Sequence, residues 1–129
     1  MINEEIIDTM LRMATDAKQR GFLTSDKNLE GACVLTSDGT LYSATNLENS
    51  TGEVDFCAPM VVLSKAIADG KLDFDALALV RETDDITSVC EECHYIINRF
   101  KIPDIILGNT KGEMNAVSAE DLVVAEHEH

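Results

Sequence analysis

Three of the four cysteines in this sequence have a spacing typical of a metal site. Cys90 and Cys93 form a C-x-x-C motif, and Cys57 lies upstream of them. Three thiolates on a tetrahedral zinc ion leave one position open for water, which is the arrangement of a catalytic rather than a structural zinc site. The spacing therefore predicts a zinc site made of Cys57, Cys90 and Cys93.

The cysteines also have plainer interpretations. Cys90 and Cys93 could form a redox-active dithiol or be two half-buried structural cysteines. Glu91 and Glu92 lie between them, and negative neighbours argue against a redox pair that depends on an activated thiolate. Cys33 lies within an apolar run and is interpreted as a core residue.

Apolar periodicity, caps and turn residues predict the elements that must position these thiols. The first helix begins after Asn3, a suitable N-cap residue, and ends near Gly21. A hairpin turns at residues 37–39, and Ser118 with Asp121 forms a capping pair for a short helix. The other expected elements are hairpin strands at 32–36 and 41–44, helices at 58–69 and 91–100, and strands at 76–80 and 105–107.

Further segments give the chain a resemblance to a known family. The segment Asn46-Leu47-Glu48-Asn49 resembles an N-x-E-N motif, Gly31-Ala32 resembles the start of a G-A-A strand, and residues 61–67 resemble the apolar helix after a C-A-E motif. With the cysteine spacing, this pattern resembles the small cytidine deaminases, including the blasticidin deaminase branch. The resemblance implies a three-layer α/β/α sandwich with a five-stranded mixed sheet. We expect one domain over residues 1–125 and a polar tail at 126–129.

Pro59 is the main departure from the family pattern. In zinc deaminases a glutamate that is not a zinc ligand moves the protons, and the signature is H-x-E or C-x-E followed by P-C-x-x-C. Here Pro59 stands at the glutamate position, and Val89 stands where the family usually has proline. Met60 stands where the family often has an arginine that offsets thiolate charge, and we expect a protonated His94 to replace part of that charge.

Two hypotheses about function follow from the missing glutamate. The leading one is a zinc-binding pseudoenzyme, impaired in hydrolysis, with a nucleoside-binding or assembly role. The alternative is an active hydrolytic deaminase of cytidine or a blasticidin-like aminopyrimidine that uses a substitute carboxylate. A purely structural fold without metal is a third possibility. Most acids in so acidic a chain are solvated surface residues, so each candidate is weak. The candidates are Glu53 and Glu91, followed by Asp55, Glu92 and Glu30.

The resemblance also implies residues that bind the substrate. Asn46 and Glu48 match positions that hold the ribose hydroxyls, whereas Asn28 falls where an aromatic residue usually packs against the nucleoside. Asn46 has a structural interpretation as well, because asparagine favours turns at strand ends. Sugar binding with altered specificity is therefore the expectation.

Composition limits the possible partners. The formal net charge of −14 repels phosphate backbones and anionic lipid, so we expect a small-molecule ligand and neither nucleic acid nor membrane as a partner. The acidic start of the sequence is unlike a signal peptide, which predicts a cytoplasmic protein with reduced cysteines. The resemblance further implies a homo-oligomer, either a tetramer or a dimer.

Overall fold

A central five-stranded sheet organises the chain. The computed structural model describes residues 2–21, 29–48 and 55–125. The strand order is β2-β1-β5-β7-β8, with only the β5–β7 pair parallel. The sheet strands are β1 (Glu30–Thr36), β2 (Leu41–Thr45), β5 (Phe74–Arg81), β7 (Asp104–Asn109) and β8 (Met114–Ser118). Within the described residues, two small two-stranded pairs flank it, β3 (Leu47–Glu48) with β4 (Asp55–Phe56) and β6 (Ser88–Val89) with β9 (Val123–Val124).

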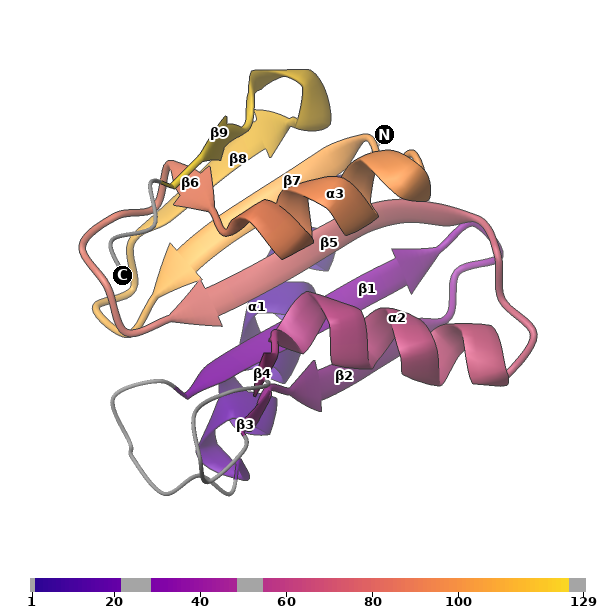
Figure 1. Cartoon of the computed structure of the whole chain (residues 1–129), viewed down its shortest axis with the longest axis horizontal. Helices are drawn as coiled ribbons and strands as arrows, with labels where there is room; N and C mark the ends of the chain where they lie inside the picture. Colours follow the sequence, from indigo (N-terminus) through magenta and orange to yellow (C-terminus); the bar gives the residue numbers. More distant parts are fainter. Residues whose placement is uncertain (1, 22–28, 49–54, 126–129) are drawn as a thin grey trace.

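Helices cover both faces of the sheet, which gives the expected three layers. Figure 1 shows α2 (Ala58–Ala68) and α3 (Glu91–Arg99) side by side in front of the sheet, and α1 (Glu4–Gln19) behind it. A 3₁₀ turn, η2 (Ala119–Asp121), lies between β8 and β9. The five-stranded mixed sheet predicted from the resemblance is confirmed.

The two faces of the sheet carry separate hydrophobic cores because successive strand residues point to opposite sides. Ala32 and Leu79 belong to the cluster that also contains Cys93 and packs under α2 and α3. Cys33 and Ala78 belong to the cluster under α1. The interpretation of Cys33 as a core residue is therefore confirmed, and its face is not the one that carries Cys93.

Most of the helices and strands predicted from the sequence are present. The side chain of Asn3 accepts a hydrogen bond from the Ile6 amide and caps α1. The predicted hairpin is formed by β1 and β2. Ser118 caps the short final turn by accepting from the Glu120 amide.

The fifth sheet strand, β8, was missed in the sequence prediction. Its sequence, Met-Asn-Ala-Val-Ser, has few strongly apolar residues, and its side chains alternate between exposed and half-buried positions. The hydrophobic pattern of such an edge strand is weak. The strand pairs with one neighbour and covers one half-buried face, so it needs few apolar residues. Pairing with β7 therefore decides this element.

Gly31 allows α1 to lie directly on β1. A Cβ atom at this position would come within 1.7 Å of the carbonyl oxygen of Ala14 in α1. We expect Gly31→Ala to lower the free energy of unfolding by about 1–3 kcal/mol, because backbone atoms must move apart to admit the methyl group. Thermal unfolding followed by circular dichroism measures this loss.

Gly108→Ala is the matched control for this prediction. There the nearest atom to an added Cβ is the side-chain Cδ2 of Leu11, at 3.0 Å, which can rotate away. We expect a smaller loss of stability than in Gly31→Ala. Equal melting temperatures for wild type and Gly31→Ala would contradict the prediction.

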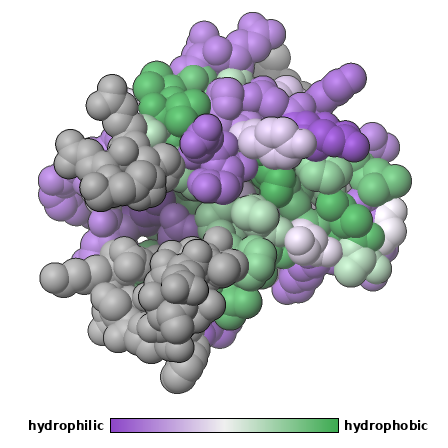
Figure 2. Space-filling view, viewed as in Figure 1, coloured by the Kyte–Doolittle hydropathy of each residue, from purple (hydrophilic) through white to green (hydrophobic). Residues whose placement is uncertain are grey.

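Two surface features complete the fold. Figure 2 shows hydrophobic side chains over α2 and between α2 and α3, beneath a hydrophilic band along α3. Tyr95 on α3 is 68% exposed, and Leu72, in the segment between α2 and β5, is 65% exposed. None of the helices in the described residues is both long enough and apolar enough to cross a membrane.

Candidate metal centre

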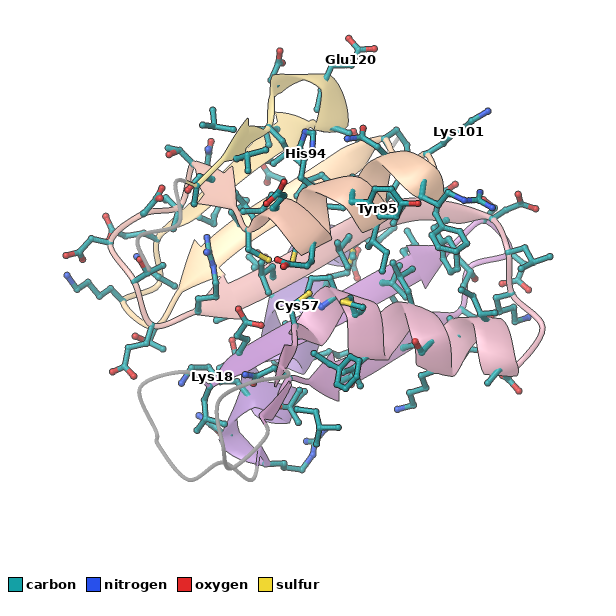
Figure 3. The ribbon with its side chains drawn as sticks, viewed as in Figure 1. Lys18, Cys57, His94, Tyr95, Lys101 and Glu120 are labelled. Carbon is teal, nitrogen blue, oxygen red and sulfur yellow. The ribbon has the colours of Figure 1, made fainter. Side chains whose placement is uncertain are left out.

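The N-termini of α2 and α3 bring the three predicted cysteines together. Cys57 and Cys90 are the N-cap residues of the two helices, both with extended backbone, and neither side chain makes a capping hydrogen bond. Cys93 lies in the first turn of α3 and is buried. Figure 3 shows Cys57 at the start of α2, facing the start of α3. The thiols are therefore available to a ligand held between the helices.

The sulfur atoms form a compact cluster. Sγ of Cys93 lies 3.0 Å from Sγ of Cys57 and 3.2 Å from Sγ of Cys90, and all three lie within 4.8 Å of one another. The free thiols are not joined by disulfides. Cys57, far upstream in the sequence, thus meets the C-x-x-C motif at one point in space.

This cluster fits a zinc ion. Thiolate–zinc bonds of about 2.3 Å in tetrahedral geometry place the sulfurs about 3.8 Å apart, so small side-chain rotations suffice to admit the metal. Both helix N-termini direct partial positive charge at the cluster and favour thiolates. Three ligands leave a fourth position for water or substrate.

Without a cation the three thiols cannot all ionise. Hydrogen bonds from Cys57 and Cys93 lower the pKa of Cys90. Hydrogen bonding to Cys90 raises the pKa of Cys57, and hydrogen bonding to Cys57 and Cys90, with burial, raises the pKa of Cys93. In the metal-free cluster, ionisation is therefore favoured at Cys90 and disfavoured at Cys57 and Cys93.

These pKa directions predict that zinc binding is coupled to proton release. Cys57 and Cys93 carry raised pKa values, so both must lose a proton when the metal binds. We expect about two protons to be released per zinc near pH 7, and zinc affinity to rise about 100-fold per pH unit there. Calorimetry in buffers of different ionisation enthalpy measures the release. Zinc affinity that does not change between pH 6 and 8 would contradict this prediction.

The segment that carries Cys90 is held from two sides. The Nη2 of Arg81 donates to the carbonyl oxygens of Ser88, at 2.7 Å, and of Asp85, at 3.2 Å. The Ala125 amide donates to the carbonyl oxygen of Val89 at 2.8 Å, beside the β6–β9 pair. No sequence pattern singles out Arg81. Its buried Nε finds no hydrogen-bond partner among the described residues.

Pro59 lies in the first turn of α2 and is buried. Proline fits there because the first-turn N–H has no partner within the helix. The neighbouring Ala58 amide donates to Oε1 of Glu30, at 3.0 Å. A carboxylate from β1 thus reaches the helix end that carries Cys57.

The other carboxylates predicted as weak substitutes differ in position. Glu91 and Glu92 are exposed in the first turn of α3, and the side chain of Glu92 lies within hydrogen-bond reach of Cys90. Glu53 lies outside the described residues, and of Asp55 only the backbone, in β4, is described. The sequence analysis did not favour Glu30 over the other weak candidates, although its alternation with Ala32 and Val34 along β1 is a signal that places it on the same face as the cysteines.

The structure describes only some of the predicted substrate-binding residues. Asn46 is buried, and its Oδ1 accepts from the Glu30 amide at 2.9 Å, which supports the structural interpretation of this residue at a strand end. The backbone of Glu48 pairs with Asp55 across β3 and β4. Asn28 lies outside the described residues. A role of these residues with a sugar stays a prediction.

The expected role of His94 in offsetting thiolate charge does not fit the structure. Its ring nitrogens lie 3.3 Å from Nδ2 of Asn98 along α3. Figure 3 shows the His94 side chain directed away from Cys57. The reason is helical geometry, since the residue after Cys93 is rotated by about 100° around α3.

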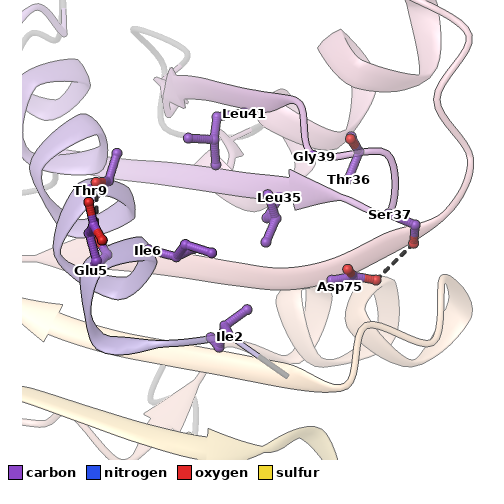
Figure 4. Close-up of a pocket in the computed structure, with 10 residues that line it drawn as sticks. All are labelled: Ile2, Glu5, Ile6, Thr9, Leu35, Thr36, Ser37, Gly39, Leu41 and Asp75. Atoms are coloured by element: carbon purple, nitrogen blue, oxygen red, sulfur yellow. Dashed lines mark hydrogen bonds between the residues drawn. The ribbon is translucent and has the colours of Figure 1, made fainter.

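A separate hollow of about 390 Å³ lies near the start of α1, and its lining includes none of the three clustered cysteines. Ile6 of α1 and Leu35 of β1 line it, and Ser37 donates to Asp75 at its edge, as Figure 4 shows. Cys33 and Leu35 share the sheet face under α1, so this hollow is on the opposite face from the thiols. It is not part of the metal centre.

Comparison with known proteins agrees with this architecture. Residues 4–109 match the model of the cytidine and deoxycytidylate deaminase zinc-binding region. A cytidine deaminase from Sporosarcina psychrophila is 30% identical over 120 residues, covering 91% of this chain and 88% of that protein. A blasticidin-S deaminase from Bacillus cereus is 26% identical over 106 residues, which is 76% of each chain.

A solved structure shows the same fold. The crystal structure of cytidine deaminase from Burkholderia pseudomallei superposes with a TM-score of 0.83 at 25% identity, covering 95% of this chain and 97% of that one. The family match spans the three clustered cysteines and the sheet strands β1, β2, β5 and β7. The chain belongs to the cytidine and deoxycytidylate deaminase family.

Proposed function

We propose that this protein is a zinc-dependent hydrolytic deaminase of cytidine or a related aminopyrimidine. The observation that carries the proposal is the meeting of three thiols from two helix N-termini, with the carboxylate of Glu30 bonded to the amide next to Cys57. The names of the relatives support the substrate class, since they include deaminases of cytidine and of blasticidin S.

The residues have distinct proposed roles. Cys57, Cys90 and Cys93 would hold zinc, which supplies a Lewis acid that acidifies an attacking water. Burial of Cys93 and the apolar side chains around it limit bulk water at the cluster. Asn46, Glu48 and Asn28 are proposed to contact the sugar or its replacement.

A second candidate function is favoured by Pro59. If this residue occupies the position of the proton-transferring glutamate, no group on α2 replaces it, and general acid–base catalysis typically contributes about 10²–10⁴ in rate. The protein would then be a zinc-binding pseudoenzyme that binds a nucleoside or supports an assembly. Zinc binding is common to both candidates, so turnover distinguishes them.

Ammonia release tests the proposal. Zinc-loaded protein is incubated with cytidine, deoxycytidine and blasticidin S, beside metal-free protein and a Pro59→Glu variant. We expect zinc-dependent release by the wild type. Release by Pro59→Glu alone would reject the proposal in favour of the impaired binding protein, and no release by either would reject deamination of these three compounds.

Self-association and location are also proposed. The exposed side chains of Tyr95, on α3, and Leu72, between α2 and β5, support a homo-oligomer, either a tetramer or a dimer. Light scattering of the zinc-loaded protein measures its mass. The strongly acidic composition supports a small-molecule ligand and disfavours nucleic acid and anionic membranes as partners. We propose a cytoplasmic location.

A further inference from the structure

We propose that Glu30, at the start of β1, is the carboxylate that transfers protons during deamination. The inference rests on the proposed function. It names a group for the proton transfer, since α2 carries no carboxylate. It assigns a catalytic role to a strand residue far from the cysteines in the sequence.

The first argument is position. Oε1 of Glu30 accepts a hydrogen bond from the Ala58 amide at 3.0 Å, and Ala58 directly follows Cys57. The carboxylate is therefore fixed at the end of α2 where the three thiols meet. A substrate held at the open side of the cluster would lie beside this carboxylate.

The second argument is rigidity, which catalysis requires of a proton-transferring group. The backbone of Glu30 is held on both sides, since its amide donates to Oδ1 of Asn46 at 2.9 Å and its carbonyl accepts from Oγ1 of Thr45 at 2.9 Å. Its Cα pairs with Arg81 across β1 and β5. A side chain on such a strand end has a defined direction.

The third argument is the character of the surroundings. Glu30 is half-buried and shares the sheet face of Ala32 and Val34, which pack in the same core as Cys93. Directly opposite residues of an antiparallel pair project to the same face, so the cation of Arg81 lies on this face too.

The reaction balances with one carboxylate and one water. The carboxylate of Glu30 takes a proton from the attacking water, whose oxygen forms a bond to the carbon that bears the amino group. The same carboxyl gives this proton to the ring nitrogen, takes a second proton from the hydroxyl now bonded to the carbon, and gives that one to the amino nitrogen. The carbon–nitrogen bond breaks, ammonia leaves and a carbonyl remains, without any change of oxidation state.

Glu30→Gln is the decisive variant because glutamine has nearly the same shape. Its amide oxygen can keep the hydrogen bond from Ala58 but cannot move protons at neutral pH. We expect ammonia release to fall about 10²–10⁴-fold, with zinc content and melting temperature unchanged. Glu82→Gln, at an exposed glutamate beyond β5, is the matched control and should keep wild-type activity.

Ligand affinity provides a readout that does not depend on turnover. Tetrahydrouridine has a tetrahedral carbon with a hydroxyl at the reacting position, whereas uridine is planar there. A group that acts in the transition state contributes mainly to binding of the tetrahedral compound. We expect Glu30→Gln to weaken tetrahydrouridine at least 10-fold and uridine by less than about 3-fold, as measured by calorimetry on zinc-loaded protein.

The outcomes separate this inference from the proposed function. Ammonia release by wild type that is undiminished in Glu30→Gln overturns the role of Glu30 while the deaminase proposal stands. If the wild type releases no ammonia, the deaminase proposal fails. The affinities for tetrahydrouridine and uridine then test whether Glu30 contacts the tetrahedral compound. Equal loss of affinity for both ligands, or no loss for either, overturns the role.

Discussion

Replacing Cys93 with alanine is expected to reduce zinc from near one ion per chain to a trace and to abolish deamination. Cys93 is the thiol that contacts both of the others, and its removal leaves two ligands from separate helices. Loss of a residue that only supports a ligand typically costs 10–100-fold in metal affinity, so loss of a ligand should cost more than about 100-fold. Metal analysis after dialysis, together with calorimetry, measures the change.

Cys33→Ala is the matched control for this variant. Cys33 and Cys93 are both almost fully buried, with exposures of 0% and 1%, but Cys33 lies under α1 on the opposite face of the sheet. Burial raises the pKa of the Cys33 thiol to about 12, so it is a poor source of thiolate. We expect full zinc content in Cys33→Ala. Stoichiometric zinc in Cys93→Ala would show that the cluster is not the metal site.

Adding a glutamate to α2 is expected to rescue the enzyme that lacks Glu30. In the Glu30→Gln/Pro59→Glu double variant, ammonia release should rise at least about 100-fold above that of Glu30→Gln alone, because a carboxylate is again available near the thiols. Position 59 lies in the first turn of α2, where a negative side chain is favoured by the helix dipole. The comparison is made at equal zinc content.

Glu30→Gln/Pro59→Gln is the control for the rescue. It makes the same change of backbone and size at position 59 but adds no ionisable group, and we expect it to stay as slow as Glu30→Gln. Equal rates in the two double variants would show that removal of proline, rather than the new carboxylate, changes the activity. Failure of both to exceed Glu30→Gln would show that a side chain at position 59 does not reach the substrate.

Local patterns predicted those parts of the fold that depend on neighbours in the sequence. Asn3 caps α1, and Ser118 caps the last turn, because each side chain bonds an amide within three residues. The hairpin of β1 and β2 turns at Gly39, whose φ of +90° suits glycine. Strand β8 escaped prediction because its pairing with β7 holds a largely polar sequence.

By itself the sequence determined the three metal-binding candidates, since the C-x-x-C motif and its distance from Cys57 have a chemical meaning that does not depend on a fold model. Tertiary structure decided which carboxylate accompanies them. Glu30 meets the Ala58 amide only because β1 and β5 pair in one register and α2 packs on that face. Such a contact depends on the assembled sheet. Alternation along β1 indicates the sheet face of Glu30, but in a sequence with 24 acidic residues it does not show that this glutamate meets the end of α2.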